Sequence, residues 1–216
     1  MKALIFDLDG TLVDSVYAHV FAWQISFAEA GMPIDGWRLH RRMGMSGGLF
    51  KRAVMRELGC TISMPRLKAL DKRHGQLFKK FLPKPRPLPG AVELLRFLRR
   101  NKIVHGIATS NQRPNINSSL EDLGIADNTV VVERGTWRAK PEPDLFLECQ
   151  ERLGVEANDC YVIGDAVWDL LAARRAGMLS IGLLSGGYGE DELTRADAFR
   201  VAADLHSYLD EPGVLP

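Results

Sequence analysis

The stretch ALIFDLDGT at residues 3–11 decides the fold of this chain. It joins a four-residue apolar run, residues 3–6, directly to the carboxylates of Asp7 and Asp9. A short apolar run with a polar end is typical of a strand that is buried on both faces of a parallel sheet. Open α/β sheets bind ligands at the carboxyl ends of their strands, so the two aspartates stand where a site is expected.

Apolar runs of the same kind recur along the chain and alternate with helical patterns. Further strands are expected at 103–108, 129–132, 160–163 and 178–184, and helices at 90–100, 114–123, 143–153 and 167–176. Strands that alternate with helices predict an α/β fold with a parallel sheet and right-handed crossovers.

Residues 14–83 break this alternation, because they contain no strong strand pattern. They predict helices over 14–30, 47–58 and 65–82, followed by a proline-rich stretch that cannot be helical and that serves as a hinge. We therefore expect a helical module inserted after the first strand, with residues 1–13 and 84–216 forming the sheet domain.

Composition excludes several classes of protein. The chain has 216 residues and a formal net charge of +1, which gives no indication of a nucleic-acid or membrane partner. The N-terminal apolar run is too short for a signal peptide or a membrane helix. Three cysteines without CxxC spacing indicate neither a disulfide framework nor a zinc site. We expect a cytoplasmic protein, and its oligomeric state is left open.

The pair Asp7 and Asp9 places two carboxylates where their charges repel. A divalent cation or a proton on one carboxylate would relieve that repulsion. Gly10 allows a tight turn directly after the pair. The alternative is an acidic exit from the strand with no chemical role.

Polar side chains also follow the later strands. Thr109 and Ser110 end the second expected strand with hydroxyls suited to phosphate oxygens, although such residues are ordinary in loops. Lys140 lies in the stretch KPEPD and is a further candidate for the site, the alternative being a lysine in a solvated hinge. Asp165 and Asp169 follow the fourth strand and are expected near Asp7, the alternative being that they cap the next helix.

Taken together, these residues give the chain a strong resemblance to the haloacid dehalogenase superfamily. It is most similar to the branch with a helical cap after the first strand, which includes phosphoglycolate phosphatase-like and beta-phosphoglucomutase-like proteins. The matching motifs are DLDGT at 7–11, Thr109, Lys140 and GDAVWD at 164–169, flanked by LVDS at 12–15, LPGAVELLRFL at 88–98 and AARRAGM at 172–178. The resemblance implies a Rossmann-like α/β core and makes residues 14–83 a helical cap.

The resemblance also implies roles for the two N-terminal aspartates. Asp7 resembles the nucleophile that forms an aspartyl-phosphate. Asp9 resembles the general acid that protonates the leaving oxygen and then the base that activates water. An aspartate at this second position is absent from the dehalogenases and phosphonatases of the superfamily, so the resemblance favours phosphoryl transfer.

The remaining implied roles concern a metal ion and the phosphate. The implied Mg²⁺ ligands are Asp7, the backbone carbonyl of Asp9, Asp165 and, in a supporting role, Asp169. The implied phosphate-binding residues are Thr109, Ser110 and Lys140. A magnesium ion and a lysine would together offset the repulsion between a carboxylate and a phosphate dianion.

The cap residues bear on the choice between phosphatase and phosphomutase. His19 aligns with the cap-hinge histidine of beta-phosphoglucomutases, whereas Met43 and Gly47 stand where that group carries basic residues. Their loss favours hydrolysis, since a mutase must hold a second phosphate. Arg41 or Arg42 would restore a mutase if either entered the site, and a plain surface charge is the alternative for both.

Other cap residues are candidates for contact with the substrate. They are Trp23, Trp37, Met43, Met45 and Ser46, for which core packing is the alternative. The sequence thus predicts a Mg²⁺-dependent phosphatase that acts on a small phosphorylated metabolite, such as phosphoglycolate or a sugar phosphate. A sugar phosphomutase is the first alternative, and a ligand-binding protein without turnover is the second.

Overall fold

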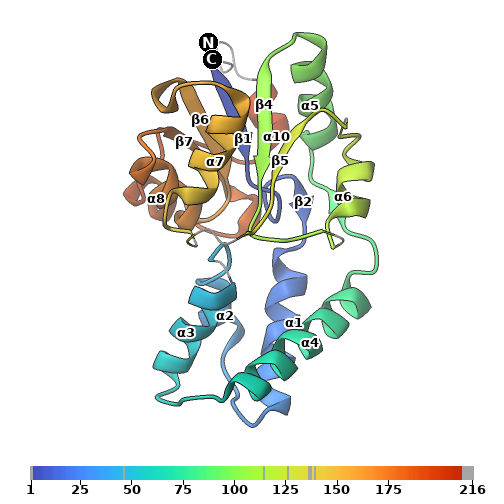
Figure 1. Cartoon of the computed structure of the whole chain (residues 1–216), viewed down its shortest axis with the longest axis vertical. Coiled ribbons are helices and arrows are strands. Elements are labelled where there is room, and N and C mark those ends of the chain that lie inside the picture. Colours follow the sequence, from blue (N-terminus) through green and yellow to red (C-terminus); the bar gives the residue numbers. More distant parts are fainter. Residues whose placement is uncertain are drawn as a thin grey trace.

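A parallel sheet of six strands forms the centre of the molecule (Figure 1). The computed structural model describes residues 2–45, 47–113, 115–125, 127–135, 138 and 140–210. In spatial order the strands are β5 (Val130–Val132), β4 (Val104–Ala108), β1 (Ala3–Phe6), β6 (Cys160–Gly164), β7 (Leu179–Leu183) and β8 (Arg200–Ala202). The predicted α/β fold with a Rossmann-like parallel core is confirmed.

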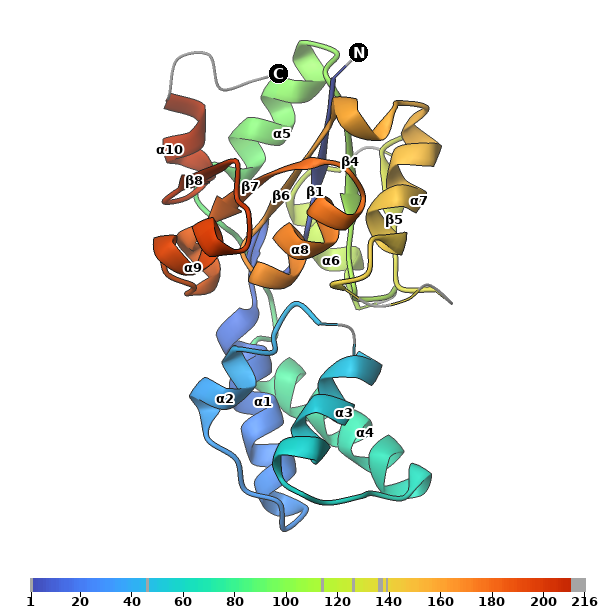
Figure 2. The same cartoon turned by 90° about the vertical axis from the view of Figure 1, so that its left-hand side faces the viewer.

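Helices cover both faces of this sheet, because successive side chains of each strand point to opposite sides. In β1, Leu4 and Phe6 belong to the hydrophobic core on one face, and Ala3 and Ile5 belong to the core on the other. The first face is covered by α5 (Ala91–Arg100), α6 (Asn117–Asp122) and α10 (Leu205–Asp210). The second face is covered by α7 (Asp144–Leu153) and α8 (Val167–Arg175), and α9 (Glu190–Arg195) packs beside α8 (Figure 2).

Four helices lie together at the carboxyl end of the strands, in the lower half of Figure 1. They are α1 (Val16–Glu29), α2 (Gly36–His40), α3 (Gly47–Glu57) and α4 (Met64–Phe81), and we call them the cap helices. They bury a hydrophobic core of their own that includes Trp23, Phe27, Phe50 and Leu70. This separate core supports the predicted division into a sheet domain and a cap, whose boundaries at 13/14 and 83/84 stay a prediction.

The chain crosses between sheet and cap helices along a short two-stranded ribbon. β2 (Val13–Asp14) pairs antiparallel with β3 (Arg86–Pro87), and the Leu88 amide donates a 2.9 Å hydrogen bond to the Leu12 carbonyl. The proline-rich stretch that was expected as a hinge supplies β3. The two crossings are therefore tied to each other at the point where they leave the sheet.

A second set of contacts joins α2 to the sheet domain. His40 Nε2 lies 2.7 Å from the Gly186 carbonyl oxygen, and the Trp168 indole donates a 3.2 Å hydrogen bond to the Arg41 carbonyl. Arg41 also forms an ion pair with Glu192. Trp168, which stands between Asp165 and Asp169 in sequence, thus binds the cap to the start of α8.

Some elements were not individually expected from the sequence. The strand β8 and the helices α2, α9 and α10 contain between three and six residues, which is too short to leave a clear periodic pattern. The helix expected over 114–123 begins only at Asn117. Within the part of the chain that the structure describes, no helix is both long and apolar enough to cross a membrane.

Candidate active site

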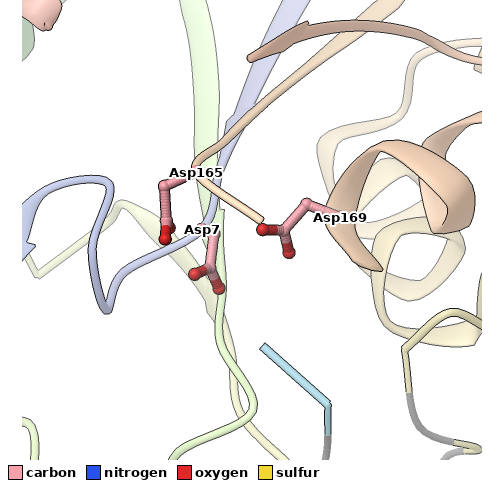
Figure 3. Close-up of side chains that lie close together, drawn as sticks. All are labelled: Asp7, Asp165 and Asp169. Atoms are coloured by element: carbon pink, nitrogen blue, oxygen red, sulfur yellow. The ribbon is translucent and has the colours of Figure 1, made fainter. Parts of the chain in front are cut away.

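Three aspartates meet at the carboxyl end of the sheet (Figure 3). Asp7 follows β1 and Asp165 follows its neighbour β6, so parallel pairing of these strands brings the two carboxylates together. Asp169 reaches them from the first turn of α8. One carboxylate oxygen from each residue lies within 4.8 Å of the others. The structure therefore brings Asp7 together with two aspartates that are distant from it in the sequence, as expected.

Lys140 forms ion pairs with two of these three aspartates. Its Nζ lies 2.6 Å from Asp7 Oδ1 and 2.7 Å from Asp169 Oδ1. The lysine is 1 % exposed, so it is not the solvated hinge residue that the sequence left open. Burial disfavours its charge, but the carboxylates of Asp169 and Asp7 raise the pKa of Lys140, which stays protonated.

The carboxylates are held in an environment with too little positive charge. Asp7, Asp165 and Asp169 are 5 %, 3 % and 0 % exposed, and among the described residues Lys140 is the ammonium that pairs with Asp7 and Asp169. Burial is the main reason why the pKa of Asp7 rises to about 7, and the pKa of Asp165 is raised by burial and by Asp169. If all four groups are ionised, two negative charges are left without compensation.

This excess charge fits a divalent metal ion. Carboxylate oxygens are the ligands preferred by hard cations such as Mg²⁺, and a dication would balance the remaining two charges. The Asp165 side chain is already oriented, because Thr11 Oγ1 donates a 2.9 Å hydrogen bond to its Oδ1. Gly10 and Gly186 pack so closely against Asp165 that a Cβ atom at either position would collide with its carboxylate.

Asp169 combines the two functions that the sequence presented as alternatives. Its Oδ2 accepts a 3.1 Å hydrogen bond from the Ala166 amide and thereby caps α8, while its Oδ1 contacts Lys140. The capping bond fixes the side chain at the helix N-terminus, where the helix dipole favours a negative charge. Asp165 is engaged by Thr11 instead.

Asp9 lies beside this group but points toward the cap. Its carboxylate accepts hydrogen bonds from Ser15 Oγ at 2.6 Å and from Asn111 Nδ2 at 3.4 Å, and His19 Nε2 lies 3.8 Å away. Burial opposes ionisation, but His19, Ser15 and Asn111 together lower the pKa of Asp9. Its side chain is not part of the three-carboxylate group, and the metal contact expected for its backbone carbonyl stays a prediction.

The hydroxyls expected to bind phosphate lie at the tip of β4. Thr109 is fully buried, and its Oγ1 accepts a 3.0 Å hydrogen bond from the Asn111 amide. Ser110 lines a cavity that also exposes Asp7, Asp9 and Asp165. The structure thus places Ser110 at the site directly and gives Thr109 a further role in shaping the loop.

Comparison with known proteins agrees with this geometry. Residues 1–177 match the family model described as haloacid dehalogenase-like hydrolase. The chain belongs to the haloacid dehalogenase-like hydrolases. It is 30 % identical to the beta-phosphoglucomutase of Bacillus subtilis, covering 95 % of this chain and 92 % of that protein.

Two further proteins are similar to this chain over nearly their whole length. The phosphoglycolate phosphatase of Rhodospirillum rubrum is 30 % identical, covering 97 % of this chain and 90 % of that protein. The crystal structure of a hydrolase from Pseudomonas syringae superimposes with a TM-score of 0.93 at 41 % identity, covering 98 % of this chain and 97 % of that one. The family predicted from the sequence is confirmed.

In this haloacid dehalogenase-like hydrolase, a cavity of about 810 Å³ lies between the sheet domain and the cap helices. His19 and Met43 line it, as expected for residues that contact a substrate. Arg42 is not among the described lining residues, because its guanidinium pairs with Glu57. Ser46, also expected at the site, lies outside the described residues.

Sequence analysis missed several residues of the cavity wall. Lys51 comes from α3, and Asp71, His74 and Phe78 come from one face of α4. Their i, i+3, i+7 spacing in α4 was the available signal, since such residues share one side of a helix. Sequence alone gives no indication that this side faces a cavity.

Proposed function

We propose that this chain is a Mg²⁺-dependent phosphatase that hydrolyses a small organic phosphate through an aspartyl-phosphate intermediate. The observation that carries the proposal is the position of Asp7, which lines the cavity, contacts Lys140 and has a carboxylate oxygen within 4.8 Å of those of Asp165 and Asp169. Such a site can both attack a phosphoryl group and offset its charge. The cytoplasmic location and the small-metabolite substrate stay predictions.

In the proposed first step, a carboxylate oxygen of Asp7 forms a bond to phosphorus while the ester oxygen leaves. Lys140 helps to hold Asp7 in place and offsets the charge that accumulates as two anions approach. A divalent cation held by Asp7, Asp165 and Asp169 would supply the remaining positive charge, keeping Asp7 ionised and reducing its repulsion from the phosphate. Ser110 is placed to bind a phosphate oxygen from the cavity wall.

Asp9 is the group assigned to proton transfer. It would donate a proton to the leaving oxygen and then accept one from the water that cleaves the aspartyl-phosphate. Ser15 and His19, which favour its ionised form, lie at the start of α1 and within it. A shift of α1 relative to the sheet would therefore change the proton affinity of Asp9.

The cap charges favour hydrolysis over isomerisation. A mutase needs a cation that is free to hold the second phosphate of its bisphosphate intermediate. Arg41 pairs with Glu192, and Arg42 pairs with Glu57. Among the described cap residues that line the cavity, the cations besides histidine are Lys51, already paired with Asp71, and the exposed Lys79.

The test is phosphate release from a panel of phosphomonoesters, with Mg²⁺ and with a chelator. Wild type should release phosphate only with the metal, and Asp7→Asn should lose activity by at least about 10³-fold because the nucleophile is removed. Asp14→Asn is the matched control, since Asp14 is exposed on β2. Full activity of Asp7→Asn would overturn the assigned nucleophile.

The same panel separates the alternatives. Isomerisation of a sugar phosphate that depends on a bisphosphate activator, without net phosphate release, would identify a mutase. Mg²⁺-dependent binding of phosphate esters without any turnover would identify a ligand-binding protein.

A further inference from the structure

The cap helices contribute to the cavity wall an ion pair that the proposed chemistry at Asp7, Asp165 and Asp169 does not use. Lys51 Nζ lies 2.7 and 2.5 Å from the two carboxylate oxygens of Asp71. Lys51 is buried, whereas the Asp71 side chain is 47 % exposed, and both residues line the cavity. The pair joins α3 to α4 and offers hydrogen-bond donors and acceptors side by side.

The cavity that this pair lines is mostly apolar. Trp23 and Phe50 line the same cavity with their rings 5.0 Å apart, and the His74 ring stacks on Trp23 at 4.0 Å. Burial, assisted by the charges of His19 and Lys51, lowers the pKa of His74 to about 3, so that this ring is neutral. In such surroundings a matched hydrogen bond gains strength and an unmatched charge is costly.

We propose that the Lys51–Asp71 pair recognises the leaving group and selects phosphate esters of neutral polyols over esters that carry a carboxylate. This inference rests on the proposed phosphatase function and narrows its substrate class. It assigns the pair to specificity, separate from the residues that act on the phosphoryl group.

The reason is that a hydroxyl group and a carboxylate can make different hydrogen bonds with the pair. A hydroxyl group both donates and accepts, so it can donate to Asp71 and accept from Lys51 without breaking the ion pair. A carboxylate can only accept, and to reach Lys51 it must approach the negative charge of Asp71. Asp71 therefore acts against anionic leaving groups, which is specificity by repulsion as well as by attraction.

Other cations of the cavity wall do not reverse this preference. Lys79 on α4 and Arg134 after β5 also line the cavity, but both are exposed to solvent. Exposed charges contribute little to binding because water and salt screen them. Because Lys51 is buried, the Lys51–Asp71 pair is the main electrostatic contact that the described cap wall offers to a leaving group.

The experiment compares substrates that differ only in CH₂OH against COO⁻. The matched pairs are glycerol 3-phosphate with 3-phosphoglycerate, and sorbitol 6-phosphate with 6-phosphogluconate. p-Nitrophenyl phosphate, which carries neither group, is the reference. For each ester kcat/KM is measured with Mg²⁺ in wild type, Asp71→Asn, Lys51→Met and a control.

In wild type the polyol ester of at least one pair should exceed its acid counterpart by about tenfold or more, the effect expected for a hydrogen bond to a charged group. Asp71→Asn should lower kcat/KM for that polyol ester and raise it for the acid ester, because Lys51 is released to bind a carboxylate. Lys51→Met should lower both, and the change should lie mainly in KM. Hydrolysis of p-nitrophenyl phosphate should change little.

Glu29→Gln is the matched control. Glu29 on α1 forms a two-bond ion pair with Arg73 on α4, the helix that carries Asp71, but the pair is exposed and does not line the cavity. This variant should keep the selectivity of wild type. Circular dichroism of every variant establishes that the cap helices are folded.

Two results would overturn this inference without affecting the proposed phosphatase function. One is a wild-type protein that cleaves p-nitrophenyl phosphate but does not prefer polyol esters. The other is an Asp71→Asn variant in which kcat/KM changes equally for all esters. A protein that hydrolyses none of the esters would instead overturn the proposed phosphatase function, and this inference with it.

Discussion

The carboxylate group at the tips of β1 and β6 and the Lys51–Asp71 pair on the cap helices face the same cavity, but their charges are balanced differently. The first places three buried carboxylates around one lysine. The second pairs one cation with one anion. The difference teaches that the proposed chemistry needs charge that folding leaves uncompensated, whereas recognition of a neutral ligand works with charge that is already balanced.

The two regions also differ in how their side chains are held in place. Strand pairing, a helix cap and close-packed glycines hold the aspartates, so their repulsion cannot be relieved by side-chain movement. The cap pair joins α3 to α4, and the Asp71 side chain is 47 % exposed.

The largest effect is expected from Lys140→Met. Removing the ammonium takes away the cation that pairs with Asp7 and Asp169, so kcat/KM should fall by about 10²- to 10³-fold. The free energy of unfolding without metal should fall by about 3–5 kcal/mol. Steady-state kinetics and urea unfolding measure both, with Lys84→Met as control because Lys84 is largely exposed. Near wild-type activity of Lys140→Met would contradict the assigned role.

The stability of the metal-free protein should depend on pH through Asp7. Its pKa is 3.8 ordinarily and about 7 in the folded protein, so the folded state holds the proton more tightly. The contribution of this group to the free energy of unfolding is therefore greatest at low pH, and it decreases as the pH rises from about 4 to 7 by at most about 1.4 kcal/mol per unit.

This dependence is measured by urea unfolding in a chelator at a series of pH values. Asp7→Asn should remove the contribution, and its curve is the baseline against which that of wild type is compared. Mg²⁺ should raise the free energy of unfolding more at pH 8 than at pH 6, since at pH 6 the metal must displace a proton. An equal effect of Mg²⁺ at both values would contradict the raised pKa.

The smallest effect concerns two glycines of the cap, Gly44 and Gly48. Gly44 has φ +89°, and a Cβ there would lie 2.9 Å from the Ala166 Cβ, so Gly44→Ala should lower the free energy of unfolding by about 1–3 kcal/mol. Gly48 lies in α3 with open space around it, so Gly48→Ala should raise it by about 0.5–1 kcal/mol. Thermal unfolding compares the two. If both substitutions changed the free energy of unfolding in the same direction, Gly44 would not be packed against Ala166 in this way.

Much of the fold could be predicted because its strands are short, apolar and buried on both faces. The runs at 3–6 and 160–163 correspond to β1 and β6, and the polar residues that follow them meet because parallel strands end at one edge. β8 was not predicted, since Arg200–Ala202 is a three-residue edge strand whose composition does not distinguish it from a loop.

The candidate site divides in a similar way. Asp7, Asp165, Asp169 and Lys140 were expected together, but sequence left open whether Asp169 caps a helix or contacts the site, and the structure shows both contacts. Arg42 was a candidate contact with the substrate. Its pairing with Glu57 depends on how α2 and α3 pack, which local sequence does not encode.

The sequence by itself determined the parallel sheet, the helical insertion and the acidic motifs at the strand ends, because these follow from local periodicity and from the fixed direction of parallel strands. Only the tertiary structure decided which face of α4 meets the cavity, that Lys51 pairs with Asp71, and how deeply Asp7 and the two neighbouring aspartates are buried. The physical reason is that burial and pairing depend on contacts between residues distant in the chain, and those contacts set the charge that a site presents.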